Sequence, residues 1–491
     1  MRKILTAVVA STLLLSSFTV ASQAATPKAG AACAKAGITQ VVKSGTKTTK
    51  FTCVKSGKKN VWNKGVVTIA KPAPTPSAEP TQPASPTPTP TPEPSFSESG
   101  TFESTSVCKL ADARIVKYQP NNVGFPLQPD IIPAQGVANL IVIPVDFSDR
   151  PASGDPSAYL KQQTEEMRNW YKLFSAGKLD LNIQIGKTWV RAPKPDSDYS
   201  VAKGVAGGAQ TSLNIERDLA QGIIQAAGSQ FDYTGVHGVF FYFPTITGVD
   251  YDMGARGGPL TTPQGAKSLF FWGGGKYHFD DRGLSVNIKR EKMWAFWIHE
   301  LLHSQGLALH APGNGYNTGL AQNQYGTSLV LSAWDIFRMS WAPEKASACI
   351  DATKTANHQL VLSPIESGSE AMRFGLVKLN QFETLVIESR RPVGYSKDWS
   401  ASETGVLVYR VDVRLDNDRS GEATGDKGNT PAFPKWGFYL APKGKDLSAV
   451  AGYEANRYIF FGKGDSVSYG GVTISVIHSG SLDVVKVEKV G

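Results

Sequence analysis

The chain has 491 residues and a formal net charge of +9, and this excess of positive charge lies at one end. Residues 1–71 contain twelve Lys and Arg residues and no acidic residue, and subtracting them from +9 leaves −3 for the rest. Nucleic-acid binding needs a basic surface on the working domain. Because the large remainder is slightly acidic, the composition argues against nucleic acid as a partner.

A secretory signal peptide is predicted at residues 1–25. Arg2 and Lys3 precede an apolar run over residues 4–20, and small residues follow near the expected cleavage site. No later stretch reaches the ~20 apolar residues of a membrane-spanning helix. We therefore expect a secreted protein, associated with the cell envelope if its basic part binds there. Its 4 cysteines are expected to form two disulfides.

Residues 26–70 are predicted to form a small basic β module. Fewer than 50 residues bury little core, so a disulfide between Cys33 and Cys53 would stabilise the module by restricting the unfolded chain. Its lysines predict binding to an anionic polymer of the cell envelope. A solvated basic tail is the alternative.

A proline-rich linker is predicted at residues 71–98, with ten prolines between residues 72 and 94. A polyproline-type segment rises ~3.1 Å per residue, so such a linker can reach on the order of 70 Å. We expect it to act as a spacer between the basic module and the following domain.

Strands and helices alternate in the first part of residues 99–357, the predicted catalytic domain. Apolar and alternating runs predict strands at residues 139–147, 178–190, 238–243 and 268–272, and helical patterns predict helices at residues 156–174 and 212–227. This α+β order, followed by a buried helix, is typical of a zincin-type upper subdomain. The strand at residues 268–272 is expected to form the sheet edge on which an extended peptide lies.

The central motif is H-E-x-x-H in the apolar stretch that begins at residue 293. His299 and His303 are four residues apart, so on a helix both imidazoles lie on one face and can bind one tetrahedral cation. The motif predicts zinc as that cation and Glu300 as the base that takes a proton from water. A pair of hydrogen-bonded core histidines is the alternative.

A third zinc ligand is expected soon after this helix. Gly306 predicts that the helix ends by turning through positive φ, and His310 follows on the reversing chain. The short loop favours His310 as the ligand and Asp335 as a support that orients a ligating imidazole. The reverse assignment, with Asp335 as the ligand, remains open.

The second disulfide is predicted between Cys108 and Cys349, because Cys33 and Cys53 belong to the basic module. It would tie the start of the globular body to the segment after the motif. In the alternative, the Cys108 thiolate occupies the open zinc position as a latency switch and leaves Cys349 unpaired.

Residues 358–491 have an all-β pattern and are predicted to form a β-sandwich-like domain. Short apolar runs alternate with turn residues, as in residues 374–379, 384–388, 405–411 and 472–477. Asp416, Asp418 and Asp426 follow one of these runs and could bind a structural calcium ion, although their spacing matches no known calcium loop.

The chain resembles the immune inhibitor A family of secreted zinc metallopeptidases over roughly residues 130–490. The likeness rests on residues 145–149 (VDFSD), 299–307 (HELLHSQGL), 332–336 (SAWDI), 386–390 (VIESR) and 405–412 (GVLVYRVD). The zinc motif occurs in many families, whereas the combination with the other stretches is more specific. The resemblance implies a metzincin-like catalytic domain that cuts protein substrates.

The function expected from the sequence is therefore that of a zinc endopeptidase with Glu300 as the general base. His299, His303 and His310 would hold zinc and leave a fourth position for water. Two alternatives remain. One is a non-proteolytic envelope-binding protein on a zincin scaffold, and the other is a metal hydrolase that acts on cell-wall peptides or glycoconjugates.

Overall fold

The structure is a computed structural model, and the chain divides into two compact units, residues 1–93 and 94–491, each described here by itself. The described residues are 28–44, 47–57, 59–69, 95–114, 122–199, 209–243, 252–274, 277–278, 288–289, 293–307, 330–354, 357–368, 370–397, 404–415, 438–440 and 460–490. The predicted signal peptide and nearly all of the predicted linker lie outside them. No helix in these ranges is long and apolar enough to cross a membrane.

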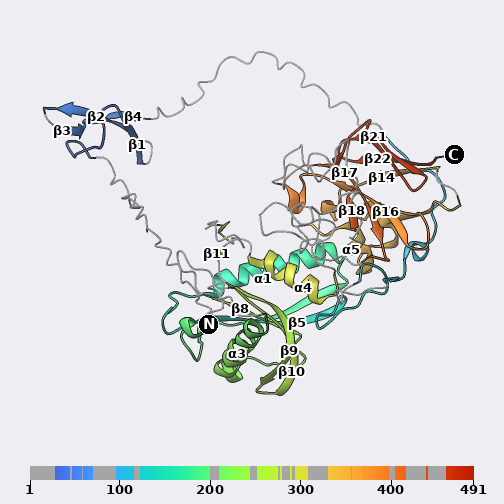
Figure 1. The fold of residues 1–491 in the computed structure, drawn as a ribbon, viewed down its shortest axis with the longest axis horizontal. Helices are drawn as coiled ribbons and strands as arrows, with labels where there is room; N and C mark the ends of the chain where they lie inside the picture. The colour runs from blue at the N-terminus through green and yellow to red at the C-terminus, as the bar shows by residue number, and fades with distance from the viewer. Residues whose placement is uncertain are drawn as a thin grey trace, which may run out of the picture. The chain divides into compact units, whose positions relative to one another are not determined.

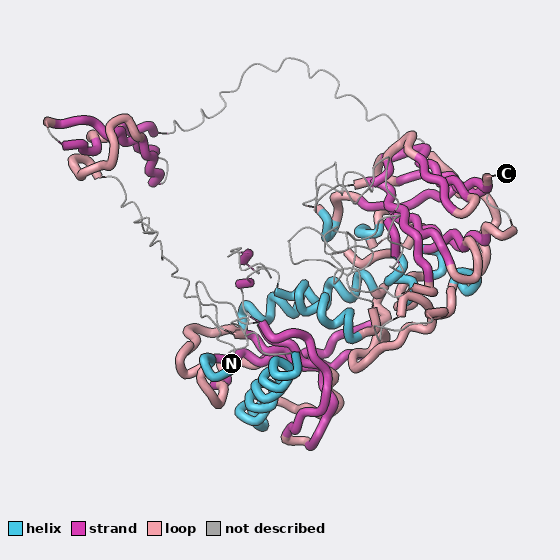
Figure 2. Tube along the Cα trace, viewed as in Figure 1, coloured by secondary structure: helices cyan, strands magenta, loops and turns pink. Residues whose placement is uncertain are grey.

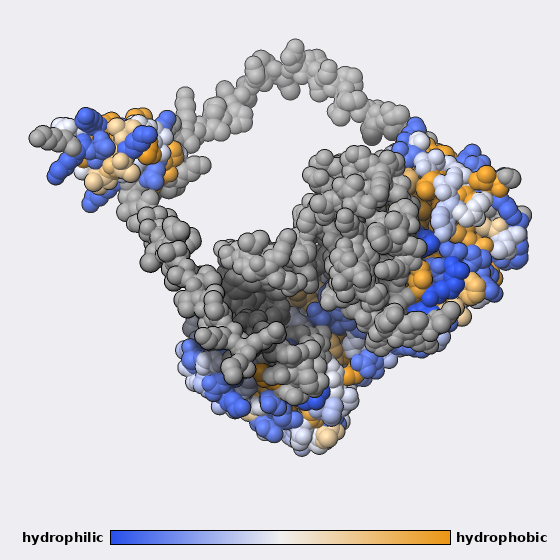
Figure 3. Space-filling view, in the orientation of Figure 1, coloured by the Kyte–Doolittle hydropathy of each residue, from blue (hydrophilic) through white to orange (hydrophobic). Residues whose placement is uncertain are grey.

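The N-terminal unit contains a small antiparallel sheet. Its strands are β1 (Thr39–Ser44), β2 (Lys47–Ser56), β3 (Lys59–Trp62) and β4 (Val66–Ile69), and β2 pairs with each of the other three. Cys53 and Trp62 are buried, and Cys53 is disulfide-bonded to Cys33, as predicted. Hydrophilic residues cover much of the visible face of this unit (Figure 3). With so little core, the disulfide is a main source of its stability.

The first part of the second unit is a mixed sheet covered by helices. Its strands are β5 (Gly136–Asp146), β6 (Leu179–Ile185), β7 (Val190–Arg191), β8 (Gly238–Tyr242), β9 (Asp252–Thr262) and β10 (Gly265–Gly274). The order is β6-β5-β8-β10-β9, and β7 also pairs with β5. All pairings are parallel except that between β9 and β10.

The prediction that the strand at residues 268–272 forms the sheet edge is wrong. These residues belong to β10, which pairs with β8 on one side and with β9 on the other. Among the described strands the edge strand is β9, whose stretch DMGARGGPLTT contains three glycines and a proline. Such residues usually mark turns, which explains why this strand was not predicted.

Helices cover both faces of this sheet. They are α1 (Ser157–Phe174), α3 (Ala209–Ala227) and α4 (Met293–Ser304), together with the short α2 (Asp196–Tyr199). Figures 1 and 2 show α1 and α4 on one face and α3 on the other. Side chains of β5 alternate accordingly, because Leu140 and Val142 pack in the core with α4, whereas Ile141 and Ile143 pack in the core with α3.

The C-terminal part contains two further sheets. The larger is formed by β13 (Ser347–Asp351), β15 (Phe374–Lys378), β16 (Glu383–Arg390), β17 (Gly405–Asp412), β18 (Phe438–Leu440) and β19 (Phe460–Phe461). The smaller has the order β14-β22-β21-β20, from β14 (Asn357–Leu362), β20 (Ser466–Tyr469), β21 (Val472–Ser479) and β22 (Asp483–Lys489).

The larger sheet has two buried faces. One face shares an apolar core with the smaller sheet, through residues such as Ile387 and Val485. The other face shares a core with α5 (Ala333–Arg338), through residues such as Tyr409 and Trp334. An α+β region followed by a β region is therefore confirmed. The first strand of the larger sheet, β13, precedes residue 358.

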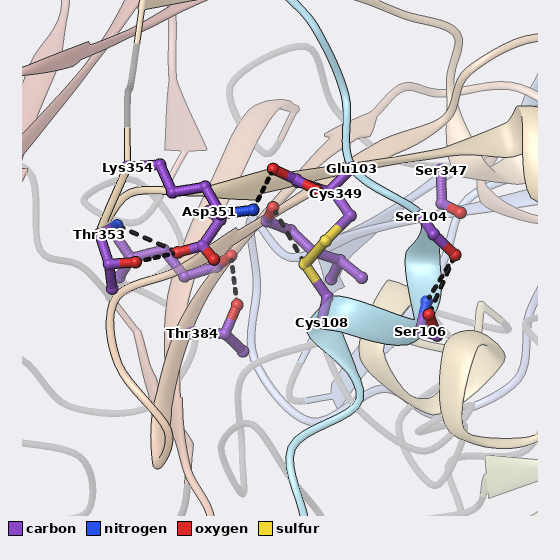
Figure 4. Close-up of a disulfide and its surroundings, with 12 residues drawn as sticks. Glu103, Ser104, Ser106, Cys108, Ser347, Cys349, Asp351, Thr353, Lys354 and Thr384 are labelled. Atoms are coloured by element: carbon purple, nitrogen blue, oxygen red, sulfur yellow. Dashed lines mark hydrogen bonds and ion pairs between the residues drawn. A yellow bond between two sulfur atoms is a disulfide. The ribbon is translucent and has the colours of Figure 1, made fainter.

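A disulfide joins the start of the second unit to this sheet, as predicted. Cys108 ends the short helix η1 (Thr105–Cys108) and is bonded to Cys349 in β13 (Figure 4). Beside the bond, the Glu103 N–H donates to the Cys349 carbonyl at 2.8 Å. Both sulfur atoms belong to this disulfide, so Cys108 has no thiolate to bind zinc and the latency-switch alternative is wrong.

Candidate metal centre

The first turn of α4 is held by α1. The backbone N–H of Trp294 has no partner within its own helix, and it donates to Gln163 Oε1 of α1 at 3.1 Å. Trp297, one turn later, packs its ring against Phe240 of β8 with centroids 5.1 Å apart. The apolar residues of α4 thus fix the helix between α1 and the sheet.

The last turn of α4 is closed by Gly306, which has the predicted positive φ of 95°. The Gly306 N–H donates to the His303 carbonyl at 3.0 Å, and the Leu307 N–H donates to the Leu302 carbonyl at 3.1 Å. This pair of bonds is a Schellman motif. A Cβ on residue 306 would lie 2.5 Å from the carbonyl oxygen of Gln128, so glycine is required by space as well as by φ.

The segment before β5 runs along this end of the helix. The Asp130 N–H donates to the Ser304 carbonyl at 2.8 Å, and Gln305 Nε2 donates to the Pro133 carbonyl at 2.9 Å. The hydroxyl of Tyr171 donates to Gln305 Oε1 at 3.0 Å. Both ends of α4 are therefore anchored, which fixes the direction of the side chains between them.

His299 and His303 converge on one point. Their Nε2 atoms are 3.3 Å apart, and their rings meet nearly at right angles, with centroids 4.8 Å apart. His299 is 3% exposed, and His303 is half-buried. Two nitrogens that each lie ~2.0–2.1 Å from a tetrahedral zinc ion are about 3.3–3.4 Å apart. The donor chemistry and the spacing both fit zinc, although 3.3 Å also permits a hydrogen bond between the rings.

Glu300 is half-buried on the same helix turn as the pair. His310, the predicted third ligand, lies outside the described residues, as do Asp416, Asp418 and Asp426. Within the part of the chain that the structure describes, no group of three His, Cys, Asp or Glu residues could hold a metal ion. Asp335, His299 and His303 all belong to the described residues, so Asp335 does not form such a group with the two imidazoles.

Asp335 lies instead in a buried polar cluster. It is in the first turn of α5, where its carboxylate accepts from Ser332 Oγ at 2.9 Å and lies 3.8 Å from Arg338 Nη1. Burial raises the pKa of this carboxyl to about 6, and Arg338 and Ser332 oppose the rise. Among the described side chains, its partners are those of α5 and its cap rather than an imidazole of α4.

Arg338 connects this cluster to the end of α4. Its guanidinium donates to the Gly124 carbonyl at 3.1 Å and to Asn122 Oδ1 at 2.8 Å, and Nη2 lies 3.5 Å from the Gly306 carbonyl oxygen. The cation is fully enclosed, and these oxygens replace part of the water it has lost, whereas Nη1 has no hydrogen bond to any described residue and burial lowers the pKa of Arg338 to about 10.

The stretch at residues 386–390 supplies the other side of this cluster. Glu388 accepts from the Ala333 N–H at 2.6 Å and from Arg390 Nε at 2.6 Å. The Trp334 N–H donates to the hydroxyl of Tyr409 at 3.0 Å. The stretches at residues 332–336, 386–390 and 405–412 therefore meet in space and attach α5 to the larger sheet.

The stretch at residues 145–149 has a local structural role. Asp146 accepts two hydrogen bonds from Arg191, at 2.7 and 2.9 Å, and Asp149 accepts from the backbone N–H of Asp196 at 2.7 Å. Hydrogen bonds from Arg191 and the Ala152 N–H outweigh burial and lower the pKa of Asp146. The aspartates thus hold the loops after β5 and before α2.

Comparison of the chain with protein-family models and with curated proteins finds no match.

Proposed function

We propose that the protein is a secreted zinc-dependent endopeptidase of a zincin-type fold. The observation that carries this proposal is the convergence of His299 and His303, whose Nε2 atoms are 3.3 Å apart, next to Glu300. Two further features support it. The chain has an α+β region followed by a β region, and it resembles immune inhibitor A peptidases.

In this proposal the motif residues have two roles, zinc binding and proton transfer. His299 and His303 bind zinc through Nε2, and His310 is the third ligand. A bound zinc ion supplies Lewis-acid activation of water and of the scissile carbonyl. The Glu300 carboxylate accepts the proton of the attacking water and then gives it to the leaving amine. The anchored ends of α4 keep the two imidazoles in place for this role.

The substrate chain is proposed to bind along the edge strand β9. It pairs only with β10 among the described strands, so its outer edge can bind an extended peptide through main-chain hydrogen bonds. Such binding does not depend on side-chain identity and suits an enzyme that cuts proteins.

The decisive experiment changes Glu300 to Gln. We expect Glu300→Gln to keep stoichiometric zinc, measured by plasma mass spectrometry, and to lose casein cleavage by at least about 100-fold. The control is Glu165→Gln, since Glu165 is exposed on α1 and among the described residues its ion-pair partner is Lys161 at 4.0 Å. Near wild-type cleavage by the Glu300 variant would overturn the mechanism.

The same preparation separates the alternatives. A chelator-sensitive activity on cell-wall peptides without casein cleavage would favour the wall hydrolase. A protein without zinc and without activity on either substrate would favour the envelope-binding protein, with the imidazole pair as a structural hydrogen bond.

The basic module is proposed to bind an anionic envelope polymer. Lysines at 28, 35, 50, 55, 59 and 64 belong to the described part of the module, and residues 1–71 contain no acid to neutralise them. Such binding weakens with salt. The test compares retention on isolated envelopes, at low and high salt, of the full chain and a chain without residues 26–94. Equal retention would show that the module is only a solvated tail.

A further inference from the structure

Exposed apolar side chains are concentrated in the basic module. Nine large apolar side chains are exposed among the described residues, and five of them belong to this module: Ile38, Val41, Val54, Val66 and Val67. The unit that contains the module is much the smaller of the two. Figure 3 shows apolar surface among the hydrophilic surface of this unit. Apolar side chains that are exposed together within a polar rim are typical of an interaction surface.

Three of these valines lie on one side of the sheet. Lys50 of β2 is directly opposite Val41 of β1 and Val66 of β4, so the three residues form one row across neighbouring strands. Val54 lies on the same side because it follows Lys50 by an even number of residues in β2. Val41 is 56% exposed, Val54 39% and Val66 65%, and Lys50 is also exposed. These four residues are called the valine–lysine face.

The opposite side of the sheet contains the small core of the module. Cys53 of β2 and Trp62 of β3 are paired there, and both are buried. Phe51 lies on the same side, where the turn before β4 packs against it, since a Cβ on Gly65 would lie 3.1 Å from its ring. The core of the module therefore uses the other side of the sheet and leaves the valine–lysine face exposed.

The charge of the module indicates which partner fits this face. Lysine is the only charged residue type between residues 28 and 69. A second copy of the face would carry the same charge and be repelled. A soluble anionic polymer would compensate the lysines but leave the valines in water. The surface of an anionic bilayer offers phosphate groups to lysine and an apolar layer beneath them to valine.

We propose that the valine–lysine face docks on an anionic lipid bilayer, with Lys50 at the phosphate groups and the three valines against the layer beneath. This inference rests on the attachment role proposed above for the basic module, and it specifies lipid rather than polymer as the partner. Each lysine near such a surface strengthens binding about fivefold, and buried apolar area adds to this attraction. Binding requires neither zinc nor peptidase activity.

The test measures co-sedimentation of the full chain with vesicles of phosphatidylcholine alone and of phosphatidylcholine and phosphatidylglycerol in equal parts. Binding to the anionic vesicles is expected to be at least about tenfold tighter. Val66→Asp should weaken it about tenfold, because the charge would enter the contact with the bilayer. The matched control is Val67→Asp. Val67 is the next residue of β4, is 53% exposed and pairs with Thr49 on the opposite side of the sheet, so its variant should lose less than about threefold.

A second pair of variants covers the case in which an aspartate unfolds the module. Tryptophan suits a strand and prefers the interface between membrane and water. Val66→Trp should therefore bind the anionic vesicles at least about tenfold more tightly, whereas Val67→Trp should bind as the unmodified chain does. Equal effects at positions 66 and 67 would overturn the proposal.

Comparison with isolated envelopes separates this inference from the attachment role on which it rests. Retention on envelopes without binding to vesicles would overturn docking on lipid and leave attachment to a polymer. Loss of both would overturn the attachment role as well. Binding to a soluble poly(glycerol phosphate) as tight as that to the vesicles, and unchanged in Val66→Asp, would also overturn the proposal, because charge alone would then explain the attraction.

Discussion

Helices α4 and α5 are both buried, but they hold polar side chains in different ways. On α5, Asp335 and Arg338 have opposite charges and lie 3.8 Å apart, and Asn122 and two backbone carbonyls complete the set around Arg338. On α4, two side chains of the same kind, His299 and His303, direct their Nε2 atoms at one point.

The difference separates a structural cluster from a candidate site. Opposite charges partly compensate each other, and the hydrogen bonds of Asn122 and the Gly124 carbonyl add to this, so the cluster of α5 stabilises the junction with the larger sheet. Two neutral imidazoles that each carry the lone pair on Nε2 can both bind one cation at the point where these atoms converge. The comparison predicts that removing a charge on α5 lowers the free energy of unfolding, whereas the two imidazoles of α4 bind a metal ion.

The largest expected effect comes from removing the cation of α5. Arg338→Met should lower the free energy of unfolding by about 3 to 5 kcal/mol, because Asp335 would remain buried without its ion-pair partner. Chemical denaturation measures this. The double variant Arg338→Met with Asp335→Leu should recover part of the loss, since no charge is then stranded.

A matched exposed pair provides the control for this experiment. Lys345 and Glu370 form an ion pair with side chains that are 63% and 76% exposed. Lys345→Met should change the free energy of unfolding by less than about 1 kcal/mol. A similarly small loss for Arg338→Met would show that α5 is not held by charge, and the contrast with α4 would fail.

The second prediction concerns pH. The pKa of Asp335 is raised from 3.8 to about 6, chiefly by burial. Between these values the folded protein holds a proton that the unfolded chain has lost, so the free energy of unfolding falls as pH rises through this window. Asp335→Asn should lack this part of the pH dependence, a difference on the order of 2 to 3 kcal/mol.

The measurement compares denaturation of the two proteins between about pH 4 and pH 7. The imidazoles of α4 are present in both, so their titration cancels in the difference. The difference should be the same with and without zinc. A zinc-dependent difference would place Asp335 at the metal as a ligand or a support.

The sequence predicted those features that depend on local pattern. The positions of α1 and α4, the turn at Gly306 and both disulfides follow from periodicity, glycine and cysteine spacing, and the structure has them. It did not predict β9, because its glycines indicate turns. Nor could it predict that Glu388 meets the N–H of Ala333, since that contact joins residues 55 apart in the chain.

The assignment of Asp335 shows the same limit. The short motif in which it lies predicts a role at the metal, and nothing local indicates that Ser332 and Arg338 contact its oxygens. Pairing between side chains on different elements is decided by tertiary packing, so only the structure reveals it.

The smallest effect concerns Gly306, where α4 and α5 meet. Gly306 and Gly265 both have φ of 95°, but a Cβ would lie 2.5 Å from the Gln128 oxygen at position 306 and would contact nothing within 4 Å at position 265. Both Ala variants bear the strain of positive φ, and Gly306→Ala alone must also displace backbone. Its loss of unfolding free energy should therefore exceed that of Gly265→Ala by at least about 1 kcal/mol.

The same pair of variants tests whether the end of α4 matters for metal. A Cβ at position 306 would displace the backbone three residues after His303. The carbonyl of the same residue lies 3.5 Å from Arg338 Nη2. Gly306→Ala should bind zinc at least about tenfold more weakly, because a displaced imidazole no longer meets its partner at ligand distance, whereas Gly265→Ala should bind as the unmodified chain does. Equal zinc affinity in both variants, measured by competition with a chelator, would show that the Schellman turn serves stability alone and that α5 has no influence on the candidate metal centre.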